Sequence, residues 1–377
     1  MYAEVAIDER VKSRNAEPVS RGNIYTLRRL GAAQGGGLVV ALIGISIYFS
    51  FMSVAFLTRA NFTVILLQSS ILGIVAVPGA MLLVSGALDL SVGSLAGLAA
   101  ASFGTFNQIF GIPLGWSIVL TLAVGATWGL GNGILVSYFR CSPVIVTLAG
   151  YSAAAGVAQL ITNENTRYSF GPAFAVLGNG VEFGIPVPVI IFSFVFVVGA
   201  YAWYRTPIGR HLIGIGANRD AAMAAGVPVS RLPCIIYVLS GTAAAAGGLI
   251  LTSQLNAASV QIGLGLELQV LTAILLGGVA FNGGRGSLWG TLAGILFIGV
   301  LNNGLTLINV GPYIASICIG GALLLAAVLD VVYRHLENVP AREPLIDTHV
   351  DTQEESGHDA PHAISVTAGS SRAWEGG

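Results

Sequence analysis

About ten long apolar stretches, joined by short segments, constrain the fold of this chain more than any other feature. Most of them are close to the roughly 20 residues that a helix needs to cross a bilayer. Only 9% of the 377 residues are charged, whereas soluble proteins carry about 25%. The sequence therefore predicts an all-α, polytopic transmembrane helix bundle with about ten spans, at residues 37–58, 65–86, 94–111, 115–138, 143–162, 186–204, 234–255, 267–281, 287–308 and 312–333.

Polar segments flank this membrane domain, which we expect to cover residues 37–335. Residues 1–36 are basic, and residues 336–377 end in a Ser, Thr, Gly and Glu mixture that predicts disorder. Arginines in short connecting segments are biased to one side, six against two, which predicts cytoplasmic N- and C-termini. The six are Arg140, Arg205, Arg210, Arg219, Arg231 and Arg285, and the two are Arg59 and Arg167.

The chain lacks the residues that ATP hydrolysis or metal chemistry would need. Its one lysine, Lys12, follows no glycine-rich turn, so no P-loop can form. The three cysteines are far apart, and His211 is the only histidine before the C-terminal region. We therefore expect no enzymatic site, no bound metal and no directly bound cofactor.

Asp89 lies between glycines in a break of two apolar runs, GALDLSVG at residues 86–93. A carboxylate in such a place should face protein or water, because exposure to lipid is costly. The residues favour a structural cap, in which Asp89 accepts hydrogen bonds near Ser91 as the next helix opens with Ser94. The alternative is direct contact with a transported solute or a proton.

A second break echoes the first. Residues 80–97 and 273–290 are identical at eight of eighteen positions, at a constant offset of 193, which aligns Asn282 with Asp89. Ser287 follows this second break and opens the next apolar run. Duplicated halves are a common plan in transporters, so an internal repeat is possible.

Asn302 and Asn303 are adjacent within an apolar run. Neither can face lipid cheaply, so at least one should bond across helices, and lining a polar pathway is the alternative. Gln68, Ser69 and Ser70 form another polar patch that could face such a pathway.

The longest charged internal segment is 205–233. Within it, residues 218–226 predict a short amphipathic helix that starts at Asn218 and stops at Gly226. Such a helix at the membrane surface suits contact with another protein, and a simple linker helix is the bland alternative.

At this segment the sequence resembles a known family. Asp220, Ala221 and Ala222, followed after three residues by Gly226, resemble the EAA-x3-G signature of permease subunits in bacterial ABC importers, although Asp220 replaces the usual glutamate. The stretches GRHLIGIGANRDAAMAAGVPVSRLPCIIYVLSG (209–241), GALDLSVGS (86–94) and ILLGGVAFNGGRGSLWGTLAGILFIGVLNNGL (274–305) resemble the ribose/xylose-type sugar permeases.

The resemblance implies a permease subunit in the bacterial inner membrane that imports a monosaccharide. It also implies a second permease copy, an external sugar-binding protein and a cytoplasmic ATPase that binds Mg·ATP, with no nucleic-acid partner. The ATPase would contact Asn218, Arg219, Asp220, Ala221, Ala222 and Gly226. The alternative function is a gradient-driven secondary transporter of a small polar solute that uses Asp89 as its coupling site.

Overall fold

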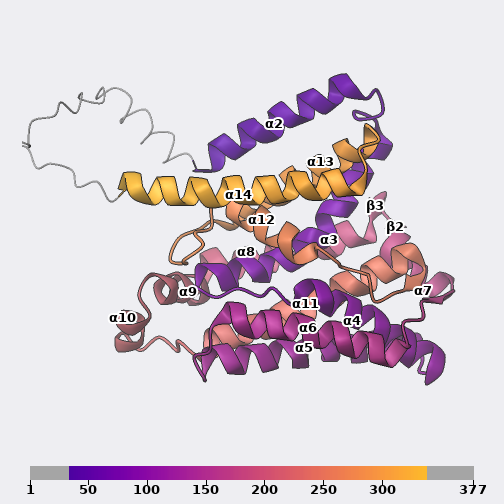
Figure 1. The fold of residues 1–377 in the computed structure, drawn as a ribbon, viewed down its shortest axis with the longest axis horizontal. Helices are drawn as coiled ribbons and strands as arrows, with labels where there is room; N and C mark the ends of the chain where they lie inside the picture. Colours follow the sequence, from indigo (N-terminus) through magenta and orange to yellow (C-terminus); the bar gives the residue numbers. More distant parts are fainter. Residues whose placement is uncertain (1–33, 338–377) are drawn as a thin grey trace, which may run out of the picture. The chain divides into compact units, whose positions relative to one another are not determined.

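The computed structural model describes residues 34–337 and shows a bundle of helices with very little β-structure (Figure 1). Almost all of the two polar terminal segments lies outside these residues. The helices are α2 (Gln34–Met52), α3 (Arg59–Val84), α4 (Val92–Gly104), α5 (Leu114–Ser137), α6 (Pro143–Thr162), α7 (Pro172–Asn179), α8 (Val187–Arg205), α9 (Pro207–Ala217), α10 (Arg219–Ala224), α11 (Arg231–Leu255), α12 (Leu266–Leu276), α13 (Leu288–Leu307) and α14 (Pro312–Glu337).

Each predicted apolar span coincides with a helix, but not every such helix can cross a membrane. Within residues 34–337, six helices are long and apolar enough: α3, α5, α6, α8, α11 and α13. The apolar stretches Gly37–Met52, Leu266–Leu276 and Tyr313–Val328 are shorter. The 13-residue α4 continues into a π-helical turn, Thr105–Ile109. An all-α membrane bundle is thus confirmed, and the count of about ten spans stays a prediction.

Local sequence explains where the helices begin and end. Thr58 caps α3 by accepting a hydrogen bond from the Asn61 amide, and Pro143 occupies the first turn of α6, where no amide donor is needed. Helix α11 ends at Asn256, whose φ of +48° is left-handed. Asparagine tolerates that conformation better than most residues do.

The core of the bundle is built on α3, α4, α11 and α13. Every residue of α4 is buried, and most of the apolar window of α3, α11 and α13 is buried as well. Helices α5, α6 and α8 expose most of their surface, as helices that face lipid would. In Figure 1, α5 and α6 lie along one side of the bundle, and α2 and α14 lie along the other.

Helices α5 and α11 touch backbone to backbone through glycines. A Cβ atom added to Gly125 would lie 2.6 Å from the Cβ of Ala245, and one added to Gly241 would lie 3.0 Å from the Gly129 nitrogen. Small residues allow this close approach. In lipid the hydrophobic effect does not drive helices together, so van der Waals contact between the two backbones stabilises the pair.

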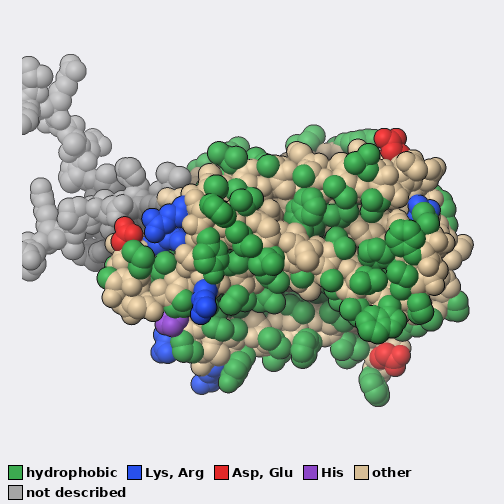
Figure 2. Space-filling view, turned by 90° about the horizontal axis from the view of Figure 1, so that it is seen from below, with side chains coloured by type: hydrophobic (Ala, Val, Ile, Leu, Met, Phe, Trp, Pro, Cys, Tyr) green, Lys and Arg blue, Asp and Glu red, His purple; other side chains and the backbone are tan. Residues whose placement is uncertain are grey.

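The two ends of the bundle differ. One end carries α7 and two short antiparallel pairs, β1 (Arg167–Tyr168) with β4 (Ala257–Ala258) and β2 (Val181–Glu182) with β3 (Ile185–Pro186). The opposite end carries α9 and α10 (Figure 1). On the face shown in Figure 2, most Lys and Arg side chains gather at the α9–α10 end, as the predicted orientation requires.

Candidate functional site

The two breaks that the sequence indicated meet at the α9–α10 end. Helix α3 gives way to residues 85–91, and α12 gives way to residues 277–287. The Gly284 amide donates to the Val84 carbonyl over 2.8 Å, and a Cβ on Gly283 would lie 2.6 Å from the Gly86 nitrogen. Both repeat-like segments are therefore helix–break–helix units in contact, and their origin by duplication stays a prediction.

The Asp89 carboxylate accepts three hydrogen bonds from Ser91 and Ser240. Its Oδ1 accepts from the Ser91 amide over 3.0 Å and from the Ser91 hydroxyl over 2.5 Å, and its Oδ2 accepts from the Ser240 hydroxyl over 2.9 Å. Tyr237 donates to the Leu88 carbonyl over 2.9 Å. These bonds fix the break to α11, an arrangement that supports the structural role of Asp89 over contact with a solute.

The short helix predicted in the 205–233 segment is present as α10. Asn218 caps it by accepting from the Ala221 amide over 2.9 Å, and Gly226 follows its end with a φ of +79°. The predicted start and stop are confirmed. Arg219 donates to the Ser137 carbonyl at the end of α5 over 3.2 Å, which ties the segment to the bundle.

The residues of α10 divide into an inner and an outer face. Ala222 is buried against Ile215 of α9 and Val229. Asp220, Ala221, Met223 and Gly226 are exposed, and nothing lies within 4 Å of the place where a Gly226 Cβ would be. A small, mostly uncharged surface is thus presented outward, on a helix whose other side is anchored.

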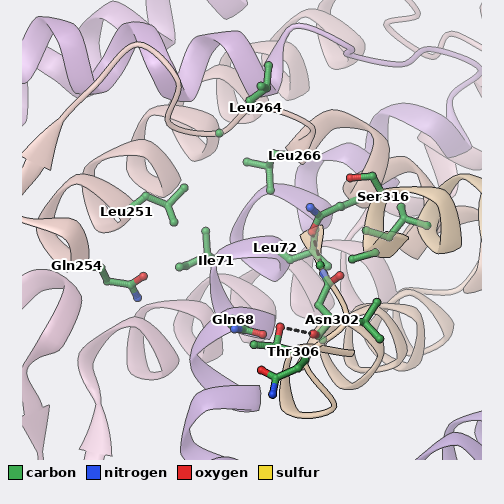
Figure 3. A pocket seen from close by; sticks show the side chains of 18 residues that line it. Gln68, Ile71, Leu72, Leu251, Gln254, Leu264, Leu266, Asn302, Thr306 and Ser316 are labelled. Atoms are coloured by element: carbon green, nitrogen blue, oxygen red, sulfur yellow. Dashed lines mark hydrogen bonds between the residues drawn. The ribbon is translucent and has the colours of Figure 1, made fainter. Parts of the chain in front are cut away.

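A cavity of about 850 Å³ lies at the end of α13 that is remote from α10. Its walls come from α3, α11, α12, α13 and α14, and Figure 3 shows these side chains arranged around one space. Its size is within the range of small-molecule sites. The polar side chains that line it are Gln68, Gln254, Gln269, Asn302, Thr306, Asn309 and Ser316, and no charged side chain of the described residues does so.

The polar groups of the cavity are suited to a neutral, hydroxyl-rich solute. Asn302 donates to the Gln269 Oε1 over 3.2 Å. The Thr306 hydroxyl donates to the Asn302 carbonyl over 2.8 Å (Figure 3). The Gln254 Nε2 is buried without a partner among the described residues. An amide both donates and accepts, so it can pair with a hydroxyl in either sense without a compensating charge.

The predicted pathway residues do not share one site. Gln68 and Asn302 line this cavity, while Asn303 pairs reciprocally with Asn61 of α3 at 2.8 and 2.9 Å. Both asparagines therefore bond across helices. Ser94 borders a separate cavity of about 370 Å³. Asn282 lies exposed in the 277–287 break, and Ser287 caps α13.

Sequence reasoning missed Gln254 and Gln269. Gln254 follows Thr252 and Ser253 at the end of a predicted span, and Gln269 follows Glu267 at the start of another, so neither stands out as an isolated polar residue. The sequence alone does not show that they share one space, because they come from different helices.

Comparison with known proteins identifies the family. The family model described as "Branched-chain amino acid transport system / permease component" matches residues 61–328. The ribose import permease protein of Bacillus subtilis (strain 168) is 35% identical over 302 residues, which is 80% of this chain and 94% of that protein. No solved structure was found to match the chain.

Two further relatives carry other solutes in their names. An autoinducer 2 import system permease protein of Photorhabdus laumondii is 37% identical over 264 residues, 68% of this chain and 79% of the relative. A xylose transport system permease protein of Haemophilus influenzae is 30% identical over 356 residues, 77% of this chain and 95% of the relative. The resemblance drawn from the motifs is confirmed, and the chain belongs to the family of branched-chain amino acid transport system permease components, on the side of the sugar-type ABC importer permeases.

Proposed function

We propose that this chain is the membrane permease of an ATP-binding-cassette importer that moves a ribose- or xylose-like monosaccharide into the cell. A solute-binding protein delivers the sugar at the end that carries α7 and the β-pairs. A cytoplasmic ATPase, which binds Mg·ATP, docks at α10 and supplies the energy. Two copies of the permease form the membrane unit, with both termini cytoplasmic.

Helix α10 is the single observation that carries this proposal. Its inner face is fixed to the bundle by Arg219 and Ala222, and its outer face exposes small residues that end at a left-handed glycine. A six-residue helix contributes little stability by itself. Its role is best explained by a partner protein that pushes on α10 and so shifts the membrane bundle between two conformations.

The side chains that line the cavity support a neutral, polar solute. A buried charged solute would be stabilised by a counter-charge, and no charged side chain among the described residues lines the cavity. The names of the ribose, xylose and autoinducer 2 relatives point to small polar solutes of this kind.

The test is to purify the chain with candidate ATPases and measure ATP-dependent sugar uptake in proteoliposomes that contain the binding protein. We expect a stable complex and uptake of a pentose only when Mg·ATP is present on the ATPase side. Failure of every ATPase to associate, or uptake driven by a proton or sodium gradient without ATP, would refute the proposal.

Replacing Asn302 by leucine tests the cavity. Leucine has a similar volume but removes the donor and acceptor, and it leaves the Gln269 amide unpaired. We expect the import rate at saturating binding protein to fall about tenfold, the cost of one or two buried hydrogen bonds, while ATPase association is unchanged.

A matched pair of threonines controls for general damage. Thr306 lines the cavity, whereas Thr127 is an exposed residue of α5 that borders a separate cavity between α5 and α6. Each hydroxyl bonds within its own helix. Thr306→Val should slow import, whereas Thr127→Val should not. Equal behaviour of the two valine variants would contradict the placement of the solute in this cavity.

A further inference from the structure

The N-terminus of α13 is completed by a side chain from another helix. The first four amides of an α-helix have no partner within it. In α13, the Thr291 amide makes the first bond of the helix itself, to the Ser287 carbonyl, and the Gly290 amide donates to the Ser287 hydroxyl. The Leu288 and Trp289 amides, which precede them, donate to the hydroxyl of Tyr204 over 3.0 and 3.4 Å. The last turn of α8 therefore supplies the acceptor for two of the amides at the start of α13.

The Tyr204 hydroxyl also forms a hydrogen bond with the Ser287 hydroxyl. Its oxygen lies 3.1 Å from the Ser287 Oγ, and either group can be the donor. About two turns earlier on α8, Phe196 packs edge-on against Trp289 with ring centroids 5.2 Å apart. Helix α8 thus contacts the start of α13 at two levels, one polar and one apolar.

Tyr204 is rigidly connected to the segment that carries α10. It lies two residues before Thr206, whose hydroxyl donates to the Ala202 carbonyl over 2.6 Å and accepts from the Ile208 amide over 3.2 Å. A single side chain therefore joins the end of α8 to the start of α9. Helix α9 leads into α10 through Asn218, so displacement of α10 is carried to Tyr204 by hydrogen-bonded joints and not by a loose loop.

The other end of α13 reaches the cavity. Gly299, Asn302 and Thr306 line it, eleven to eighteen positions after Leu288. A helix rises about 1.5 Å per residue, so α13 is a rod of about 30 Å that links the Tyr204 contact to the cavity wall. Movement at the N-terminus of α13 must displace or tilt its C-terminal end, because the helix is closely packed on both sides and cannot absorb the movement locally.

We propose that Tyr204 is a positioning residue for transport: its hydroxyl transmits movement of the α9–α10 segment to α13, and so to the solute cavity. This inference rests on the proposed function, in which an ATPase moves α10. It assigns the transmission step to one hydroxyl group that touches neither the ATPase nor the solute.

The test compares Tyr204→Phe with Tyr201→Phe in the reconstituted complex of permease, ATPase and binding protein. Phenylalanine keeps the ring and removes only the hydroxyl. Tyr201, one turn earlier on α8, is exposed and has no hydrogen-bond partner in the part of the chain that the structure describes. For Tyr204→Phe we expect ATPase association to persist and sugar imported per ATP hydrolysed to fall about fivefold, the value of one typical hydrogen bond. Tyr201→Phe should match the wild type.

Ser287→Ala separates transmission from simple capping. It removes the cap that α13 supplies for itself and the Ser287–Tyr204 hydrogen bond, but it keeps the two bonds from the Leu288 and Trp289 amides to Tyr204. We therefore expect lower thermal stability, with an import-to-ATP ratio that falls less than in Tyr204→Phe. The inference is overturned if Tyr204→Phe leaves that ratio unchanged, or if Ser287→Ala lowers it as much.

Amide hydrogen exchange keeps this test distinct from that of the proposed function. In Tyr204→Phe, the Leu288 and Trp289 amides should exchange about tenfold faster, since each loses its acceptor. Unchanged exchange overturns the inference whether or not the wild type transports sugar. A wild type that imports nothing, with exchange accelerated in the variant, refutes the proposed function and leaves the contact itself established.

Discussion

A Gly129→Leu variant is expected to be lost from the membrane as folded protein, while Gly131→Leu accumulates like the wild type. The two glycines are two residues apart on α5. A Cβ on Gly129 would collide with the Tyr237 carbonyl group of α11 and lie 3.1 Å from the Val238 Cα, whereas nothing lies within 4 Å of a Cβ on Gly131. The same substitution therefore meets a packed backbone at one site and open surface at the other.

The free energy of unfolding of Gly129→Leu should fall by about 3 kcal/mol or more, the upper end of the range for overpacked cores. The loss is this large because the added side chain meets backbone, which cannot move aside by changing rotamer. That is a large part of the 5–15 kcal/mol by which folded proteins are typically stable. The substitution should also disturb the candidate site, because Tyr237 donates a hydrogen bond to the Leu88 carbonyl in the 85–91 break. Separation of α5 from α11 would release that break.

The measurement is the yield of monodisperse protein and its apparent unfolding temperature after extraction in mild detergent. Gly131→Leu adds the same side chain to the same helix, so it controls for helix propensity and for expression. Equal yield and equal unfolding temperature for the two variants would show that the α5–α11 crossing is not held at backbone distance.

The sequence predicted helices well where a bilayer dictates their length. Apolar runs such as 143–162 became α6 with the same bounds, since the run must be helical and its ends must reach water. Turn chemistry was equally readable: Asn218 and Gly226 bracket α10 as expected. These features depend on residues that are close in sequence, which is why a single sequence contains them.

Features that depend on contacts between distant residues were not predictable. Helix α12 ends at Leu276, although its apolar run continues to position 281, and the glycine that follows packs against α13: a Cβ on Gly277 would lie 2.6 Å from the Gly290 carbonyl carbon. Nothing in the sequence distinguishes Tyr204 from the other aromatic residues at the ends of apolar runs, and its partner Ser287 lies 83 positions away. Helices that are apolar on all sides give no periodic signal for which face meets which neighbour, so the cavity and the α8–α13 contact required the structure.

Gly226→Arg is expected to abolish ATPase association and import while the permease itself still folds. Gly226 adopts a φ of +79°, which costs a bulky residue about 1–3 kcal/mol, and its Cβ direction is open. The arginine would therefore project from the exposed surface beside Met223. Loss of a central interface contact of 2 kcal/mol or more weakens binding by about thirtyfold, and a buried unpaired charge adds to that.

Gly226→Asn separates backbone strain from the added bulk. Asparagine is among the residues that most readily accept a left-handed conformation, and it is small and neutral. We expect Gly226→Asn to keep most of the ATPase affinity and of the import rate, with Gly226→Arg inactive in both. Co-purification with the ATPase and ATP-dependent uptake measure the difference. Equal loss in the two variants would mean that the backbone turn is what matters, and normal binding by Gly226→Arg would remove α10 from the interface. In the first case the ATPase depends on the angle at which α10 leaves the bundle, and in the second the energy of hydrolysis must enter the permease through another surface.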